Sequence, residues 1–180
     1  MSVFGWIIIE QHIGNSFNWK LPWADYKAGF GSINADFWLG LEQMHLLTSS
    51  QAYRLRVEVL LKSNNLWYSA EYWSFHIGDE AHDKYRLSVD GYSGDAGDAL
   101  QYPGDYIGNR KYGHYLHDGM MFSTYDKDND LSTVGCVEGR PGAWWFNRCF
   151  WACLTCNTNH QWDTLPGDHL VNSRMMIKPQ

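Results

Sequence analysis

The chain has 180 residues, and at about 150 residues per domain this length predicts a single domain. Aromatic residues make up 16% of the chain and include ten tryptophans, which excludes a disordered protein because such side chains supply the burial that folding needs. The net charge of −6 argues against a general nucleic-acid binder or a polybasic membrane binder, since both need clustered Lys and Arg.

The predicted elements of the first third are short. Residues 6–9 (Trp-Ile-Ile-Ile) are typical of a buried strand, and the run is too short to span a membrane. Residues 25–27 predict a short helix that Gly29 ends, and residues 38–47 predict another. Residues 53–61 alternate apolar with charged side chains, a period of two that predicts a half-buried strand.

The later elements are fewer. Residues 85–89 alternate in the same way and predict a strand, while residues 91–119 are rich in Gly and Asp and have the composition of a loop. Residues 175–177 (Met-Met-Ile) predict a closing strand. The whole pattern predicts a mixed α+β domain with short helices and a loop-rich C-terminal half.

The acidic turn at residues 126–130 (Asp-Lys-Asp-Asn-Asp) is the strongest local motif. Three carboxylates at alternate positions repel one another unless solvent or a hard cation such as calcium screens them. The EF-hand pattern fails, because Leu131 stands at its glycine position and Val137 at its glutamate position, with Glu138 one residue late. The turn is therefore either a calcium loop of another kind or a solvated acidic turn.

The cysteines leave several interpretations open. Cys136 and Cys149 enclose twelve residues, and a disulfide across that loop would contribute about 3 kcal/mol. Cys153 and Cys156 form a C-x-x-C motif that predicts either two surplus thiols or one local disulfide. A zinc site from these cysteines and His160 is a weaker alternative, because no second cysteine pair completes it.

Motifs for catalysis are incomplete. Residues 91–95 lack the second glycine of a nucleophile elbow, and no Gly-Lys-Ser/Thr follows residues 94–98 as a P-loop requires. His114 and His117 lie in the glycine-rich segment, where we expect histidines to be exposed and free. The sequence therefore does not predict an enzyme.

Seven segments, in order along the chain, carry a family resemblance. The sequence resembles the fibrinogen C-terminal domain family, including its short fibrinogen-like proteins and its angiopoietin- and ficolin-type modules. The matching segments are W-x-x-x-W-x-x-Y-x-x-G-F-G at 19–31, F-W-L-G at 37–40, L-R-V-E at 55–58, Y-S-G-D-A-G-D-A-L at 92–100, F-S-T-Y-D-K-D-N-D at 122–130, W-W-F-N-R-C at 144–149 and M-x-I-K-P at 175–179.

The resemblance implies a fold and its subdivision. We expect residues 1–180 to form one α+β domain with a twisted, mainly antiparallel sheet. Residues from about 5 to 100 would form a central sheet subdomain, and residues from about 101 to 180 a loop-rich calcium and ligand subdomain. The family's first subdomain would precede Gly5, so we expect a fragment, an isoform or a degenerate copy with reduced stability or a need for a partner.

The resemblance also implies a calcium site. In the matching positions, calcium binds the side chains of Asp128 and Asp130 and the backbone carbonyls of Ser132 and Val134. Carbonyl ligands tolerate varied side chains, so Ser and Val at these positions are no objection.

Two covalent features follow from the same resemblance. The family disulfide corresponds to a bond between Cys136 and Cys149. A cis peptide is expected at Arg148–Cys149.

The predicted ligand pocket departs from the family pattern. The resemblance places it beside the calcium loop, with Arg148, Phe150 and Trp162 as candidate lining residues. Phe150 and Thr158 replace the usual His and Tyr, and Arg140 or its neighbour Gly139 stands where the knob-binding hole has an acid. An aromatic wall without a polar partner argues against inherited binding of acetyl groups.

The resemblance therefore predicts a secreted, non-enzymatic recognition domain, ordered by Ca²⁺ and a disulfide, that binds a protein receptor or partner. The alternatives are a lectin for acetylated glycans and a degenerate copy without a ligand. A homo-oligomer stays open, and no nucleic-acid partner is expected. The first five residues lack the basic and apolar regions of a signal peptide, so secretion is inferred from the family alone.

Overall fold

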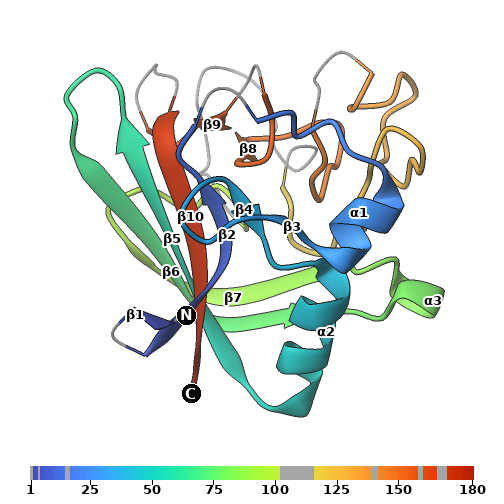
Figure 1. Cartoon of the computed structure of the whole chain (residues 1–180), viewed down its shortest axis with the longest axis horizontal. Helices are drawn as coiled ribbons and strands as arrows, with labels where there is room; N and C mark the ends of the chain where they lie inside the picture. The colour runs from blue at the N-terminus through green and yellow to red at the C-terminus, as the bar shows by residue number, and fades with distance from the viewer. Residues whose placement is uncertain are drawn as a thin grey trace.

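The computed structural model describes residues 2–3, 5–14, 17–101, 116–138, 142–157, 160–165 and 170–180. Its main element is a twisted antiparallel sheet in the order β3-β4-β2-β10-β5-β6-β7, with β1 pairing to β2, while β8 and β9 pair separately (Figure 1). The bounds are β1 Ser2–Val3, β2 Trp6–His12, β3 Phe30–Gly31, β4 Phe37–Trp38, β5 Tyr53–Leu61, β6 Trp67–Ile77, β7 Leu87–Gly94, β8 Ala152–Cys153, β9 Gln161–Trp162 and β10 Leu170–Pro179.

The last strand of the chain lies in the middle of the sheet. β10 pairs with β2 on one side and with β5 on the other, both antiparallel (Figure 1). On β5, buried Leu55, Val57 and Val59 alternate with half-buried Arg54 and Arg56, as the period of two predicts. The sheet thus has an inner face toward the core and an outer face that carries charged side chains.

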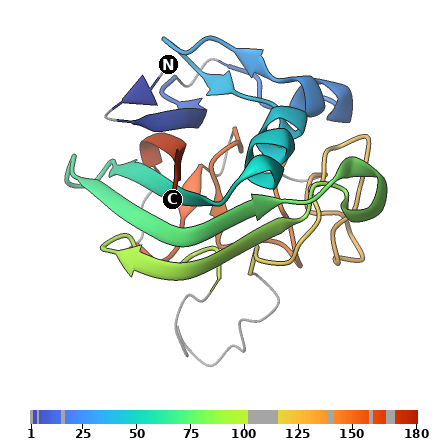
Figure 2. The ribbon, with the colours of Figure 1, turned by 90° about the horizontal axis from the view of Figure 1, so that it is seen from below.

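Three short helices accompany the sheet in the described residues: α1 (Trp23–Ala28), α2 (Leu41–Ser50) and α3 (Glu80–Asp83). α2 lies on the inner face beside β6, and the C-terminal loops lie on that same side (Figure 2). The predicted α+β class is confirmed. No helix among the described residues is long and apolar enough to cross a bilayer.

The start of the second helix was predicted three residues too early. Trp38 belongs to β4, where it pairs with Glu10 of β2, and the helix begins at Leu41. Gly40 explains the difference, because its φ of 103° is incompatible with a right-handed helix. A Cβ there would also lie 2.8 Å from the carbonyl oxygen of Lys27.

Aromatic side chains fill the core between the sheet and the C-terminal loops. Trp38, Phe122 and Trp145 contact one another, with ring centroids 5.1–6.1 Å apart, and all three are fully buried. The indole N–H of Trp38 donates to the carbonyl of Tyr26, and that of Trp145 donates to the carbonyl of Tyr85. These hydrogen bonds satisfy the polar atoms that burial of tryptophan brings with it.

Candidate functional site

The first carboxylate of the acidic turn is used for structure. Asp126 accepts hydrogen bonds from the hydroxyl of Thr124 at 2.7 Å and from the backbone N–H of Trp23 at 2.9 Å. It therefore ties the turn to the first residue of α1. Asp128 and Asp130 are left as the candidate cation ligands of this turn.

Asp128 and Asp130 lie against each other. The backbone N–H of Asp130 donates to the Asp128 carboxylate at 3.0 Å. The Asp130 carboxylate in turn accepts from the backbone N–H of Ser132 and of Cys136, both at 2.7 Å. Burial raises the pKa of the Asp130 carboxyl, and the Asp128 carboxylate raises it further, while the two backbone N–H groups act in the opposite direction.

The donor set of this loop fits calcium. Calcium takes oxygen ligands, with carboxylates and backbone carbonyls mixed. Among the described residues, no backbone or side-chain hydrogen bond claims the carbonyl of Ser132 or of Val134, so both remain available beside the two carboxylates. No group of three or more His, Cys, Asp or Glu side chains in the described ranges could hold a metal ion, so a site here depends on the two carbonyls.

The loop is anchored to the core on its other side. The side-chain amide of Asn129 donates to the carbonyl of Phe122 at 2.7 Å, and its backbone N–H donates to the hydroxyl of Ser123 at 2.9 Å. The backbone N–H of Leu131 donates to the carbonyl of Asn147. These bonds hold the carboxylates in place through residues that are not candidate cation ligands.

A disulfide joins the end of this loop to the next segment. Cys136 and Cys149 are bonded, with their Cα atoms 5.3 Å apart, as the family resemblance implied. The expected cis peptide at Arg148–Cys149 was wrong, because the described residues contain no cis peptide bond. The trans form is the lower-energy one by about 3–4 kcal/mol, and this segment makes its contacts in that form.

The three predicted pocket residues differ in how far they are buried, and their shared role in a pocket stays a prediction. Arg148 is exposed, whereas Phe150 is 6% exposed and packs against Phe146. Trp162 is 2% exposed, and its indole N–H donates to the carbonyls of Ala96 and Gly97. None of them lines the surface cavities that the described residues form around α3, on the outer face of the sheet or beside Asp128. Gly139, Arg140, Thr158 and His114 lie outside the described residues.

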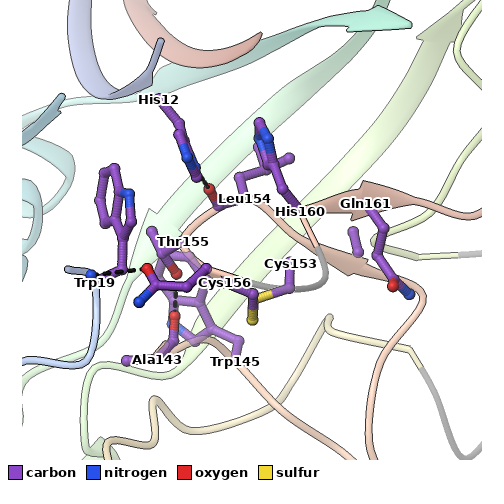
Figure 3. Close-up of a disulfide and its surroundings, with 12 residues drawn as sticks. His12, Trp19, Ala143, Trp145, Cys153, Leu154, Thr155, Cys156, His160 and Gln161 are labelled. Carbon is purple, nitrogen blue, oxygen red and sulfur yellow. Dashed lines mark hydrogen bonds between the residues drawn. A yellow bond between two sulfur atoms is a disulfide. The ribbon is translucent and has the colours of Figure 1, made fainter. Parts of the chain in front are cut away.

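The C-x-x-C motif forms the local disulfide that was one of its two interpretations. Cys153 and Cys156 are bonded and fully buried, and Figure 3 shows them below the carbonyl of Leu154. Because both disulfides take up all four cysteines, the zinc and free-thiol interpretations were wrong. The turn between these cysteines is held on both sides: Thr155 donates to the carbonyl of Ala143, and the Leu154 carbonyl contacts Nδ1 of His12 at 2.8 Å.

A buried polar chain continues from His12 into the sheet. The rings of His12 and His160 stack with centroids 4.0 Å apart, and Nε2 of His160 lies 2.9 Å from the hydroxyl of Ser173 on β10. That hydroxyl donates to Glu10 of β2, whose pKa is raised well above its ordinary value by burial. These polar contacts link the C-x-x-C turn to the two central strands, β2 and β10. No concave site opens onto it among the cavities described above.

Gly142 gives a direct test of how tightly this turn is packed. A Cβ at this position would lie 2.8 Å from the Cα of Cys156 and closer still to the carbonyl oxygen of Thr155. We expect Gly142→Ala to lower the free energy of unfolding by about 1–3 kcal/mol, the usual range for overpacking. Urea denaturation measures this. Gly142 does not have a positive φ, so the cost of this variant comes from packing and not from backbone strain. An unchanged free energy of unfolding would contradict the close packing.

His117 is a structural residue that the sequence analysis placed wrongly. It was expected to be exposed, but it is fully buried. Its Nδ1 lies 2.7 Å from the carbonyl of Trp145, and its Nε2 accepts from the backbone N–H groups of Trp151 and Ala152. Its partners lie about 30 residues further along the chain, so no local pattern could have revealed the role.

Comparison with known proteins agrees with this geometry. The family model described as fibrinogen beta and gamma chains, C-terminal globular domain, matches residues 2–178. Fibrinogen-like protein A of Apostichopus parvimensis is 38% identical over 180 residues, which cover 92% of this chain and 56% of that protein. Human fibroleukin is 36% identical over 197 residues, covering 98% of this chain and 42% of that protein. The chain thus spans about half the length of these curated relatives.

Solved structures show the same fold. The fibrinogen-like globe domain of human ANGPTL6 has a TM-score of 0.84 at 29% identity, covering 97% of this chain and 78% of that chain. A lamprey fibrin D-dimer, complexed with the peptide ligand Gly-His-Arg-Pro-amide, has a TM-score of 0.87 at 31% identity, covering 97% of this chain and 61% of that chain. Because the family model spans nearly the whole sequence and the sheet and loops follow the same fold, the chain belongs to the fibrinogen C-terminal domain family.

Proposed function

We propose that this domain is an extracellular recognition module in which calcium, bound at Asp128 and Asp130, orders a loop surface that binds a protein partner. Domains of this family are typically extracellular and non-enzymatic, and relatives such as fibroleukin and fibrinogen are secreted. The observation that carries the proposal is the hydrogen bond from the Asp130 backbone N–H to the Asp128 carboxylate, which places both residues beside the Cys136–Cys149 disulfide. Two carbonyls of the same loop accept no hydrogen bond from the described residues.

Charge explains why the loop needs a cation. Two carboxylates in contact repel each other, and burial of Asp130 makes its negative charge more costly. Calcium supplies the positive charge that offsets both effects. Asp130 is then held in its ionised form with its two backbone N–H donors, and through Cys136 the order of the loop reaches the disulfide and the segment after Cys149.

A protein partner is favoured over an acetylated glycan by the state of the predicted pocket. Phe150 and Trp162 are buried at 6% and 2% exposure, so neither offers an open aromatic wall to a small ligand. Apolar side chains are instead exposed on the loop surface itself, where Leu131 is 55% and Val134 is 73% exposed. Exposed apolar side chains within a polar rim are characteristic of protein-binding surfaces. The peptide bound to the lamprey fibrin fragment is consistent with recognition of polypeptides in this fold.

Calcium titration with thermal unfolding tests the proposal. We expect the unfolding temperature of the oxidised chain to rise with the logarithm of calcium concentration, with a stabilisation of about 2.7 kcal/mol at one hundred times the Kd. Asp128→Asn with Asp130→Asn should abolish the response. Asp126→Asn is the matched control: it lowers the starting stability, because Asp126 holds Thr124 and Trp23, but it should keep the calcium shift.

Hydrogen exchange locates the effect. Calcium should slow exchange of the backbone amides in residues 126–138 and leave the amides of β5 and β6 unchanged. A calcium response that persists in the double variant, or protection spread evenly over the sheet, would refute the proposal.

A further inference from the structure

The outer face of the sheet carries a ladder of charged and aromatic side chains. Lys178 of β10 lies opposite Arg54 of β5, and Arg174 lies opposite Glu58. On the other side of β5, Arg56 lies opposite Glu71 of β6. The strands β5, β6 and β10 together carry four cationic and only two acidic side chains, on a protein whose net charge is −6. These three strands therefore differ in charge from the molecule as a whole.

Both acidic side chains are already used in the middle of the ladder. Arg56 forms ion pairs with Glu58 at 2.7 Å and with Glu71, and Arg174 also pairs with Glu58. Among the described residues, no carboxylate forms an ion pair with Arg54 or Lys178. Two like charges directly opposite each other on neighbouring strands destabilise a sheet, so this end of the ladder has an unmatched positive charge.

Tryptophan rings flank that unmatched charge. The guanidinium carbon of Arg54 lies 5.3 Å from the ring centroid of Trp6 and 5.9 Å from that of Trp73. Trp73 is 61% exposed. Within the described part of the chain the buried Nε of Arg54 has no hydrogen-bond partner, and the guanidinium lies against the two rings. The arrangement fixes a cation beside a flat, exposed aromatic surface.

A second arginine lies against a tryptophan ring further along the sheet. Arg174 lies 5.5 Å from the ring centroid of Trp67, which is 47% exposed. Trp67, Arg174 and Asp95 help to line a surface cavity of about 330 Å³ there. From Trp73 to Trp67 along β6 the face extends about 20 Å at about 3.4 Å per residue. A ligand that contacts both arginine–tryptophan pairs must be long, and it must carry the same kind of group at both of its ends.

We propose that this outer face, defined by Trp6, Arg54, Trp67, Trp73, Arg174 and Lys178, binds an acidic polysaccharide. The Trp rings offer apolar faces on which sugar rings can stack, and Arg54 and Lys178 pair with the carboxylate or sulfate groups of the sugars. The surface lies on strands β2, β5, β6 and β10, away from the calcium loop, so it would hold the domain on a polyanionic matrix while the loops bind their partner (Figure 2).

Binding of defined polymers to the intact chain tests the proposal. The probes are immobilised heparin, which is sulfated, and hyaluronate, which carries carboxylates alone; neutral dextran and polyglutamate are the comparison polymers. We expect the chain to bind at least one acidic polysaccharide at 0.1 M salt, to lose binding as salt rises, and to bind neither comparison polymer. The binding should persist in EGTA, which separates it from the calcium-dependent function proposed above.

Charge reversal at Lys178 gives the sharpest variant. Lys178→Glu places a carboxylate opposite Arg54, so it should keep or raise the unfolding temperature while weakening polysaccharide binding at least tenfold. Lys62→Glu, an exposed site in the turn after β5, makes the same change in net charge and should retain most of the binding. Trp73→Thr should weaken binding at least fivefold. If Lys178→Glu unfolds, Lys178→Gln replaces it.

Four outcomes would overturn the proposal. They are no binding to either acidic polysaccharide, equal weakening by Lys178→Glu and Lys62→Glu, unchanged binding by Trp73→Thr, and equal binding of polyglutamate, which would indicate an acidic polypeptide instead.

Discussion

We expect His117→Leu to lower the free energy of unfolding by about 3–5 kcal/mol at pH 7. The imidazole bonds three backbone groups, namely the buried carbonyl of Trp145, the buried N–H of Ala152 and the half-buried N–H of Trp151. Leucine has a similar volume but removes all three hydrogen bonds, and each buried group that loses its hydrogen bond costs about 1–3 kcal/mol. Urea denaturation at pH 7 measures the loss.

The same residue predicts acid lability in the wild-type chain. A carbonyl only accepts and backbone N–H groups only donate, so His117 must carry its proton on Nδ1 and leave Nε2 as an acceptor. Burial lowers its pKa from 6.5 to about 4. Between these two values the unfolded chain binds a proton that the folded chain does not, so stability falls as pH drops from about 6.5 to 4, by about 3 kcal/mol.

Comparison of wild type with His117→Leu isolates the contribution of His117 to the pH dependence of stability. Other groups titrate in the same range, but they are present in both proteins, so the difference between wild type and His117→Leu should shrink by about 3 kcal/mol from pH 7 to pH 4. His82→Gln is the control, because the His82 side chain is 85% exposed and its loss should change stability by less than about 0.5 kcal/mol. A difference that stays constant with pH would contradict a neutral buried imidazole.

The local sequence pattern predicted strand β5 in full, whereas it missed β6 and predicted only part of β10. Each side chain of β5 meets either the core or the outer face, so its alternation could be predicted. β6 was not predicted, because Trp67 and Trp73 lie on the outer face against Arg174 and Arg54, and exposed tryptophans hide the period of two. β10 was predicted for only three of its ten residues, since inward-facing Ser173 is polar and is satisfied by Glu10 across the sheet.

The candidate calcium ligands were predicted from the family resemblance, because matching the sequence segments in order assigns each residue to a position of the family's calcium loop. Their anchoring was not predicted, since the bond from Leu131 to the Asn147 carbonyl joins segments that meet only after folding. The spacing of Cys136 and Cys149 allowed a disulfide between them, and the family resemblance predicted it. The spacing of the C-x-x-C motif allowed a disulfide as well, but it did not decide between a disulfide and free thiols. Spacing limits which cysteines can meet, whereas burial around Cys153 depends on the whole core.

We expect Cys136→Ala with Cys149→Ala to lower the free energy of unfolding by about 3 kcal/mol, measured by urea denaturation of the oxidised proteins. The bond closes a loop with a sequence separation of 13, and removing it restores that loop's freedom to the unfolded chain. Removing the disulfide should also loosen the calcium loop, because the backbone N–H of Cys136 donates a hydrogen bond to the Asp130 carboxylate at 2.7 Å. Calcium affinity should fall about tenfold, equivalent to about 1.4 kcal/mol.

Cys153→Ala with Cys156→Ala is the matched control, since it also removes one disulfide and two sulfur atoms. Its sequence separation of 3 gives a smaller loop term of about 2 kcal/mol, to which the lost packing of two fully buried sulfurs adds. The hydrogen bonds to Asp130 come from Ser132 and Cys136, so calcium affinity in this variant should stay within about twofold of wild type. Equal loss of calcium affinity in both variants would mean that general loosening, rather than the link from Cys136 to Asp130, controls the site.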